Sequence, residues 1–211
     1  MTQPKIQLYW YWTTNPQKIR LVLEEWQLTY ECIKIDLARG GQHSHTYGQL
    51  NPRHKVPTLK VGDAVLWESG AALTYLAQVF PQMWPTQPSD QGQALSLLFM
   101  ESTIFQRLAG THYWQQVIQP RFGKTPNQDK IATAASQLQP IYTILKSQLG
   151  ENDFLFGTIT AVDYAFAPWL PHLDLDGWPV LKGWRDRLMS RGAWSRAEMR
   201  QELTALKHPK K

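Results

Sequence analysis

The alternation of strand and helix patterns in the first 80 residues is the feature that most restricts how this chain can fold. Runs typical of strands alternate with runs of helical period, in the order strand, helix, strand, helix, strand, strand, helix. The expected strands include 6–11 and 30–36, and the expected helices include 17–26 and a short irregular one at 45–50. This order predicts a compact α/β unit over residues 1–80, with a parallel crossover in its first half and an antiparallel hairpin in its second.

A cluster of prolines marks the end of this unit. Pro81, Pro85 and Pro88 fall close together, and a stretch with this spacing cannot be helical throughout. We therefore predict a linker over 81–90. Strand alternation does not return after it, so we predict an all-helical second domain over 91–211.

Two long helical patterns dominate the second domain, from about 91 to 119 and from about 127 to 149. Pro140 lies inside the latter, and an interior proline removes a backbone hydrogen bond, so we expect a kink or a break there. The chain closes with a basic tail, Lys207–Lys211.

Composition excludes several classes of function. The net charge of +5 lies partly in the basic tail, with no basic stripe or zinc-type spacing, so we expect no nucleic-acid partner. No apolar run approaches the ~18 residues that span a bilayer, and the N-terminus lacks a signal-peptide core, which predicts a cytoplasmic protein without a membrane partner. Cys32 is the single cysteine, and its strand-like surroundings favour a packed thiol over a nucleophile.

A proline enters the third expected strand, in Lys55-Val56-Pro57-Thr58-Leu59. Because Pro57 cannot donate to a ladder, it belongs at the start of the strand, with the preceding peptide bond either cis or trans. A cis bond would turn the backbone N–H and C=O of Val56 outward, where they could pair with an extended peptide ligand. Alternatively, Pro57 is an ordinary first residue of the strand and has no part in ligand binding.

Glu68 and Ser69 stand where the hairpin gives way to a helical pattern. Free N–H groups at a helix N-terminus attract a carboxylate, and Glu68 could hold an ammonium, so an amino-acid head group would satisfy both. Taken singly, Ser69 is as well explained as an N-cap and Glu68 as a partner of the helix dipole. The ordered combination with Val56 and Pro57 favours a pocket for a small peptide that carries a thiol.

Other candidate motifs are interpreted as structural. Thr160 and Asp163 have the spacing of a capping box at the start of a buried helix. His43 with His45, and His172 with the two aspartates that follow it, lack a spacing diagnostic of metal binding, so we expect no metal site.

Together these motifs resemble the cytosolic glutathione transferases, in particular bacterial theta-, delta- and nu-like members, over nearly the whole chain. The resemblance rests on residues 56–59, on 68–71, on the capping box, and on four late positions, which are Trp184, Arg187, Ala193 and Trp194. It implies a thioredoxin-like N-terminal domain (βαβαββα) that binds glutathione and an all-helical C-terminal domain that contributes a second-substrate pocket, within a homodimer.

The resemblance also implies a glutathione site. The backbone of Val56, before Pro57, would pair with the cysteinyl part, and Glu68 with Ser69 would hold the γ-glutamyl head. Three further residues match positions that relatives use near the glycyl carboxylate: Gln42, His54 and Lys55.

Catalysis requires the thiolate of glutathione, and a free thiol with a pKa of about 8.5 is mostly protonated at neutral pH. A donor near the start of the first helix would stabilise it. Thr13 falls at the serine position of delta and theta classes, and with Asn15 as a second donor it resembles the Thr-x-Asn of nu-class relatives. Tyr9 falls near the tyrosine position of other classes. Alternatively, Thr13 or Thr14 only caps the helix.

The second-substrate pocket is expected on one side of the helix that carries Phe105, Leu108, Ala109, His112 and Tyr113, with Trp169 contributing from a later helix. The competing interpretation is that this stripe is simply core.

The resulting hypothesis is a detoxifying enzyme that adds glutathione to small hydrophobic electrophiles or uses it to reduce organic hydroperoxides. Thr13-x-Asn15 also leaves open a glutathione-dependent disulfide-bond reductase. A third possibility is a non-catalytic binding module on the same fold.

Overall fold

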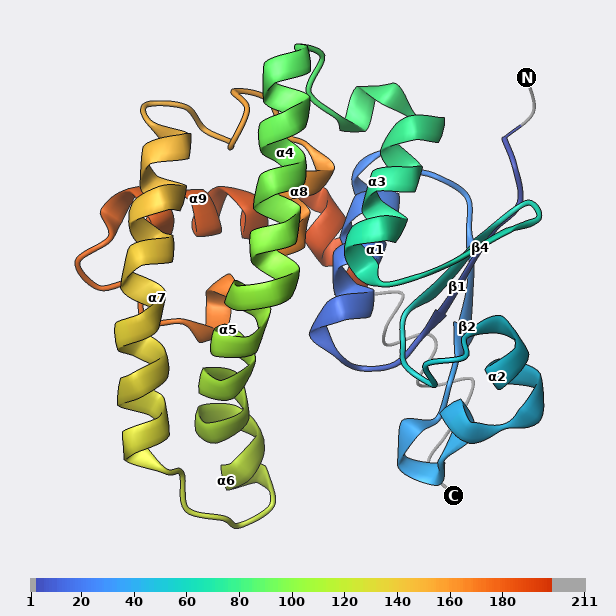
Figure 1. Ribbon diagram of the computed structural model, residues 1–211, viewed down its shortest axis with the longest axis horizontal. Helices are drawn as coiled ribbons and strands as arrows, with labels where there is room; N and C mark the ends of the chain where they lie inside the picture. The colour runs from blue at the N-terminus through green and yellow to red at the C-terminus, as the bar shows by residue number, and fades with distance from the viewer. Residues whose placement is uncertain (1–2, 199–211) are drawn as a thin grey trace. The chain divides into compact units, whose positions relative to one another are not determined.

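The computed structural model describes residues 3–198, so the basic tail at 207–211 lies outside the described residues. These residues divide into two compact units, one made of 3–79 and 190–198 and the other of Phe80–Met189 (Figure 1). Within residues 3–198, no helix is both long and apolar enough to cross a membrane.

The first unit is built on a four-stranded mixed sheet, as predicted. Its strands are ordered β2-β1-β3-β4, where β1 pairs parallel with β2 and antiparallel with β3, and β3 pairs antiparallel with β4. The bounds are β1 Ile6–Trp10, β2 Glu31–Lys34, β3 Thr58–Val61 and β4 Ala64–Trp67. The parallel crossover followed by a hairpin confirms the thioredoxin-like fold.

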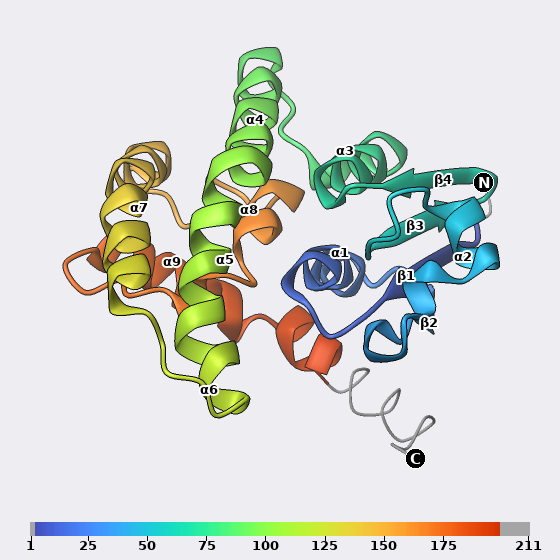
Figure 2. The same cartoon turned by 60° about the horizontal axis from the view of Figure 1, so that its bottom comes forward.

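Side chains of β1 alternate between the two faces of the sheet. Ile6, Leu8 and Trp10 are buried on the face that carries α1 (Thr14–Glu25) and α3 (Ser69–Val79) (Figure 2). Tyr9 faces the other way, toward the short α2 (His45–Leu50), where its ring centroid lies 6.0 Å from that of Tyr47. Two 3-10 turns, Leu37–Arg39 and Gly41–His43, connect β2 to α2.

Helix α1 begins three residues earlier than the predicted 17–26. Thr13 has the extended conformation of an N-cap residue, with φ −136° and ψ 160°. Pro16 follows within the first turn, where its missing N–H has no intrahelical acceptor in any case, so it does not delay the start of the helix.

The residues from Ser190 to Glu198 pack on α1 and therefore belong to the first unit, whereas the sequence analysis assigned all of 91–211 to the second. Arg191 pairs with Glu25, and the Arg196 guanidinium donates to the Glu24 carbonyl at 2.6 Å. The buried Arg20 donates to the carbonyl of Ala197. These long-range partners cannot be recognised from local patterns.

The second unit is helical, as predicted, although its first long helix is interrupted. α4 begins at Pro88, inside the predicted linker, because proline is tolerated in a first helical turn. Two π-helical turns, Glu101–Phe105 and Trp114–Ile118, then divide the run expected over 91–119. The remaining elements are α4 Pro88–Met100, α5 Gln106–Tyr113, α6 Gln119–Arg121, α7 Gln128–Leu149, α8 Ala161–Phe166, α9 Pro179–Ser190, and the 3-10 turns Pro81–Met83 and Leu170–His172.

Pro140 does not break α7, which is assigned as continuous from Gln128 to Leu149. Pro140 and Ser136, whose carbonyl lacks its usual donor, both lie on the exposed side of the helix. Water can therefore satisfy the orphan carbonyl, and the helix tolerates the proline.

The predicted capping box of α8 is present and extends into a buried network around Asp163. The Asp163 carboxylate accepts from the N–H of Leu155 at 3.0 Å, from the N–H and hydroxyl of Thr160 at 2.9 and 2.8 Å, and from the Trp184 indole at 3.0 Å. Burial raises the pKa of Asp163, and these donors oppose that shift. The network joins the start of α8 to α9.

Candidate functional site

The sheet register brings three separate sequence motifs to one edge of the first unit. Thr58 pairs with Tyr9 near the end of β1 and with Trp67 at the end of β4. Because both neighbours of β3 run antiparallel to it, the residues before β3 lie beside those that follow β1 and β4. The Val56 segment, the Thr13 segment and Glu68 therefore meet at this edge.

The segment before β3 is held by two buried side chains. The Lys55 carbonyl accepts from the Tyr47 hydroxyl at 2.6 Å and from the Asn51 amide at 2.8 Å. The Tyr47 hydroxyl uses its single proton on that carbonyl, so the Thr58 hydroxyl donates to Tyr47, 2.8 Å away, and itself accepts from the Asn51 amide at 3.0 Å. Sequence reasoning missed Tyr47 and Asn51, because these bonds join α2 to β3 and leave no local signature.

Val56 follows this anchored carbonyl, and the Val56–Pro57 peptide bond is cis. The described strand ladders begin only at Thr58, so the backbone of Val56 lies outside them. Pro57 is buried and Val56 half-buried. The arrangement fits the predicted role of Val56 as a pairing edge for an extended peptide.

Glu68 occupies a strained position between β4 and α3. Its φ of 73° lies in the left-handed region, which is costly for a residue with a Cβ and is found preferentially at functional sites. Its carboxylate forms an ion pair with Arg53, and Ser69 opens α3 in a buried position. Arg53, which the sequence analysis did not single out, therefore lies beside the candidate site through this ion pair.

His54 and Gln42, both predicted to lie near the glycyl carboxylate, are in direct contact. His54 Nδ1 lies 2.8 Å from the Gln42 backbone carbonyl, which can only accept, so Nδ1 carries the proton. A Cβ at position 48 would lie 2.8 Å from the His54 ring, so Gly48 is required for this packing. The side-chain oxygen of Gln42 is buried without a hydrogen-bond partner. Lys55 is exposed beside this pair.

Thr13 and Asn15 stand at the start of α1 with unused hydrogen-bonding capacity. Thr13 is the exposed N-cap residue, yet its side chain makes no capping hydrogen bond. The side-chain oxygen of Asn15 is buried without a partner. Thr14 is the first residue of the helix and is half-buried. Thr13 therefore has the backbone conformation of an N-cap residue, but its hydroxyl does not cap the helix.

Tyr9, the remaining catalytic candidate, has a raised pKa because burial disfavours the phenolate and Glu31 adds a like charge. Tyr9 therefore stays protonated at neutral pH and can act only as a neutral donor.

The predicted second-substrate residues all lie in the helical unit. Phe105 and Ala109 are fully buried, and the Phe105 ring packs edge-on against Phe166 with centroids 5.0 Å apart. His112 is buried, and the Tyr113 ring makes a tilted contact with the His172 ring, with centroids 4.4 Å apart. Trp169 is buried and donates its indole N–H to Glu101 at 3.2 Å. Their role toward a ligand stays a prediction.

In the part of the chain that the structure describes, no three His, Cys, Asp or Glu side chains lie together so that they could hold one metal ion.

Comparison with known proteins identifies the family. Residues 4–78 match the model of the glutathione S-transferase N-terminal domain, and residues 128–188 match that of the C-terminal domain. The chain belongs to the glutathione S-transferase family.

Individual relatives span most of the chain. The disulfide-bond oxidoreductase YfcG of Escherichia coli is 28% identical over 94% of this chain and 96% of its own. Glutathione S-transferase PARB of Nicotiana tabacum is 27% identical over 86% and 91%. A glutathione transferase homologue from Lodderomyces elongisporus, solved with two glutathione molecules per subunit, is 25% identical and covers 92% of this chain and 97% of its own, with a TM-score of 0.79.

Proposed function

We propose that this protein is a glutathione transferase that activates the thiol of glutathione for attack on small hydrophobic electrophiles or organic hydroperoxides. The observation that carries the proposal is the register Tyr9–Thr58–Trp67, which gathers the Val56, Glu68 and Thr13 segments at one sheet edge. Three segments that suit a backbone, a zwitterionic head and a thiol thus come together, as the binding of a single tripeptide requires.

In this proposal, Val56 pairs its backbone with the cysteinyl residue, anchored through the Lys55 carbonyl. The γ-glutamyl ammonium binds Glu68, and its carboxylate binds the N-terminus of α3 at Ser69 and the Arg53 guanidinium, which is already beside Glu68. His54, Lys55 and Gln42 hold the glycyl end. Each charged group of the ligand then faces a group of opposite charge on the protein.

The thiolate is stabilised by hydrogen bonds from the Thr13 hydroxyl and the Asn15 amide. Both groups are at the start of α1, where the helix dipole adds positive potential. Thr13 is favoured over Tyr9 because its hydroxyl has no capping bond to give up, whereas Tyr9 points to the α2 face. Holding thiolate and electrophile together supplies the rest of the rate enhancement.

A disulfide-bond reductase activity is the second candidate. It is supported by Thr13-x-Asn15 and by the 28% identity to YfcG, a disulfide-bond oxidoreductase. The bound thiolate would attack a disulfide and release one of its thiols, and a second glutathione would then attack the mixed disulfide, release the other thiol and yield glutathione disulfide.

Detoxification in the cytoplasm by a homodimer is the biological setting we propose. The second-substrate pocket would draw on the side of α5 that carries His112 and Tyr113, with Phe105, Ala109 and Trp169 as its supporting wall.

The test combines binding with turnover. Retention on immobilised glutathione is followed by activity toward chlorodinitrobenzene, phenethyl isothiocyanate, cumene hydroperoxide and bis-hydroxyethyl disulfide. We expect retention and turnover for the wild type, lost turnover with kept retention for Thr13→Ala, and little change for the neighbouring control Thr14→Ala. Absence of both retention and turnover in the wild type would reject the proposal, and retention alone would indicate a binding module.

The same panel separates the two activities. Turnover confined to the disulfide favours the reductase, and turnover confined to the electrophiles and the hydroperoxide favours the transferase.

A further inference from the structure

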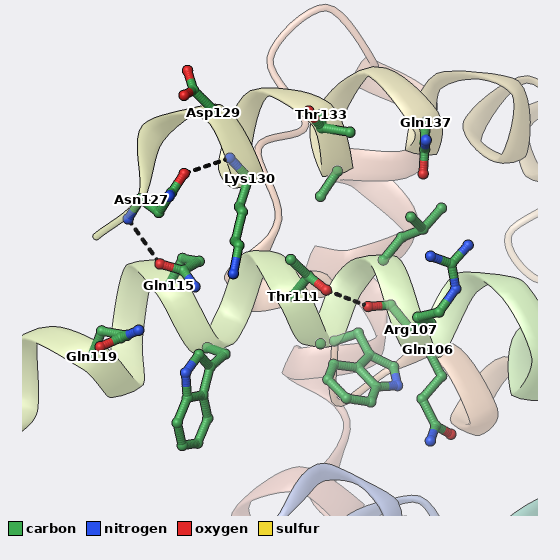
Figure 3. Close-up of a pocket in the computed structure, with 15 residues that line it drawn as sticks. Gln106, Arg107, Thr111, Gln115, Gln119, Asn127, Asp129, Lys130, Thr133 and Gln137 are labelled. Carbon is green, nitrogen blue, oxygen red and sulfur yellow. Dashed lines mark hydrogen bonds between the residues drawn. The ribbon is translucent and has the colours of Figure 1, made fainter. Parts of the chain in front are cut away.

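The first unit has its own surface beside Thr13 that an electrophile must meet, because the thiolate proposed to lie there is the atom that it attacks. A pocket of about 1020 Å³ between α5 and α7, with Thr111 and Gln115 in its lining, lies wholly within the helical unit (Figure 3). The residues next to Thr13 belong instead to the ends of β1 and β2 in the first unit. This second surface contains a lysine, Lys34.

Lys34 is the last residue of β2, and the sheet fixes it beside the end of β1. The parallel register pairs it with Trp10, and the N–H of Ile35 donates to the Trp10 carbonyl at 2.8 Å. Because the two strands run parallel, their carboxyl ends lie at the same edge of the sheet. That edge is the one from which the segment Tyr11–Thr13 leads into α1. Lys34 therefore lies beside this segment.

Two aromatic rings of the segment hold the Lys34 ammonium. Its Nζ lies 5.9 Å from the ring centroid of Tyr11 and 6.0 Å from that of Trp12, which is the range of a cation–π contact. Trp12 in turn packs edge-on against the buried Trp10, with centroids 4.7 Å apart. The Thr13 N–H donates to the Tyr11 carbonyl at 2.7 Å and closes a tight turn. The ammonium is thus held by the two residues that directly precede Thr13.

No carboxylate neutralises Lys34 in the part of the chain that the structure describes. The side chain is half-buried and forms no ion pair with any residue from 3 to 198. Asp36, the nearest acidic residue along the chain, accepts from the Ala38 N–H at 3.1 Å and pairs with Arg39. Residues 11–18 contain no acidic side chain.

The aromatic contacts position the ammonium without supplying a counter-charge. A cation–π contact holds the charge near a ring but provides no carboxylate oxygen, so the N–H groups of Lys34 can still donate to one. A charge-assisted hydrogen bond from an ammonium to a carboxylate is about twice as strong as a neutral one. The surface next to Thr13 therefore favours a ligand with a negative charge.

We propose that Lys34 is a specificity-determining residue that selects electrophiles carrying a carboxylate. The carboxylate accepts from the Lys34 ammonium, the body of the electrophile packs beside the Trp12 ring, and its reacting carbon meets the thiolate at Thr13. The inference rests on the proposed function of this site and names the class of electrophile that it prefers.

The reaction of a chlorinated nitrobenzoate illustrates the role. The glutathione thiol gives up its proton to solvent, and the thiolate sulfur forms a bond to the ring carbon that carries chlorine. The C–Cl bond then breaks, and chloride leaves with the bonding electrons. Lys34 takes no part in these bond changes, because it binds the carboxylate and so orients the ring.

The test uses a matched pair of electrophiles, 4-chloro-3-nitrobenzoate and its uncharged methyl ester. Values of kcat and KM are measured for both in wild type, Lys34→Gln and Lys34→Arg, and each variant is compared with wild type so that the intrinsic reactivities cancel. Lys60→Gln is the control, because Lys60 is also a half-buried lysine of the same sheet but pairs with Gln7, away from this edge. Circular dichroism checks that each variant folds.

Lys34→Gln is expected to lower kcat/KM for the benzoate by about tenfold, mainly through KM, because the ion pair forms on binding and persists in the transition state. The ester is expected to change by less than about twofold. Lys34→Arg is expected to keep most of the preference for the benzoate, and Lys60→Gln is expected to behave like wild type. The KM for glutathione is expected to stay the same in all variants.

Several results would overturn the inference and leave the proposed function standing. Unchanged benzoate kinetics in Lys34→Gln would remove Lys34 from recognition, and equal losses for benzoate and ester would indicate a structural role. An equal loss of benzoate preference in Lys60→Gln would indicate a general charge effect. A raised KM for glutathione with both electrophiles would assign Lys34 to a carboxylate of glutathione.

The wild type separates this inference from the proposed function. Turnover of the ester without turnover of the benzoate would reject the inference alone. Absence of turnover with both electrophiles would also reject it, and absence of retention on immobilised glutathione in addition would reject the proposed function as well.

Discussion

Two helices of this protein begin at a threonine with nearly the same backbone conformation, and they use it in opposite ways. Thr13 before α1 has φ −136° and ψ 160°, and Thr160 before α8 has φ −132° and ψ 168°. Thr160 is buried inside a capping box with Asp163, whereas Thr13 is exposed and its side chain makes no capping bond. A fully bonded helix start stabilises the fold, and an unsatisfied one leaves donors for a ligand.

The largest effect is expected at the start of α8, where Thr160 and Asp163 form the capping box. Asp163→Ala should lower the free energy of unfolding by about 4 kcal/mol, because several buried donors lose their common acceptor. Urea denaturation measures this loss. Asp153→Ala is the control, since that carboxylate is exposed and pairs only with Arg187 on the surface. Similar losses of unfolding free energy in both variants would show that the buried network around Asp163 does not explain the effect.

The next largest effect is expected at the start of α1, where the Thr13 side chain makes no capping hydrogen bond. Thr13→Ala should lower kcat/KM for glutathione conjugation by about 100-fold, or about 2.7 kcal/mol of transition-state stabilisation, because the thiolate loses a hydrogen bond. Steady-state kinetics measure the change. The bound glutathione thiol should also titrate at a higher pH in the variant, as ultraviolet absorbance of the thiolate reports. Full activity in Thr13→Ala would remove Thr13 from the catalytic assignment.

Replacing the two threonines should affect the free energy of unfolding in the opposite order, with the larger loss at Thr160 and the smaller at Thr13. Thr160→Ala should cost about 1 kcal/mol, as is usual for losing an N-cap side chain, whereas Thr13→Ala should cost less than about 0.5 kcal/mol. Thermal and urea unfolding of the two variants under one set of conditions compare them directly. An equal cost would contradict the distinction between the two helix starts.

The smallest effect is expected for Tyr9→Phe. The pKa of Tyr9 is raised by burial and by Glu31, so the phenol is protonated below its ordinary pKa of about 10 and supplies no ionisation near neutral pH. The variant should keep the wild-type rise of kcat/KM with pH, and its rate should change by less than about threefold. A shift of that rise to higher pH would transfer thiol activation from Thr13 to Tyr9.

The sequence allowed the fold to be predicted wherever a local pattern carries it. The strand and helix order, the hairpin and the capping box of Thr160 were all predicted and are present. The boundaries were less accurate: α1 starts at Thr14 and α4 at Pro88, because prolines in a first turn do not delay a helix. Of the kink or break expected at Pro140, the break is not found, because α7 is continuous from Gln128 to Leu149.

The candidate site was predicted only in part. Val56, Glu68 and Ser69 were recognisable because each stands at the end of a patterned element. Arg53 and Tyr47 were missed, since nothing in the adjacent sequence reveals an ion pair to Glu68 or a hydrogen bond to the Lys55 carbonyl.

The sequence by itself determined the element order, the family resemblance and the capping box of α8, because these depend on residues a few positions apart. Only the tertiary structure decided which polar groups are satisfied. It pairs Arg53 with Glu68, buries Asp163 among its donors, and leaves the Thr13 side chain without a capping bond. Such pairing depends on side chains brought together from distant elements, which a local pattern cannot encode.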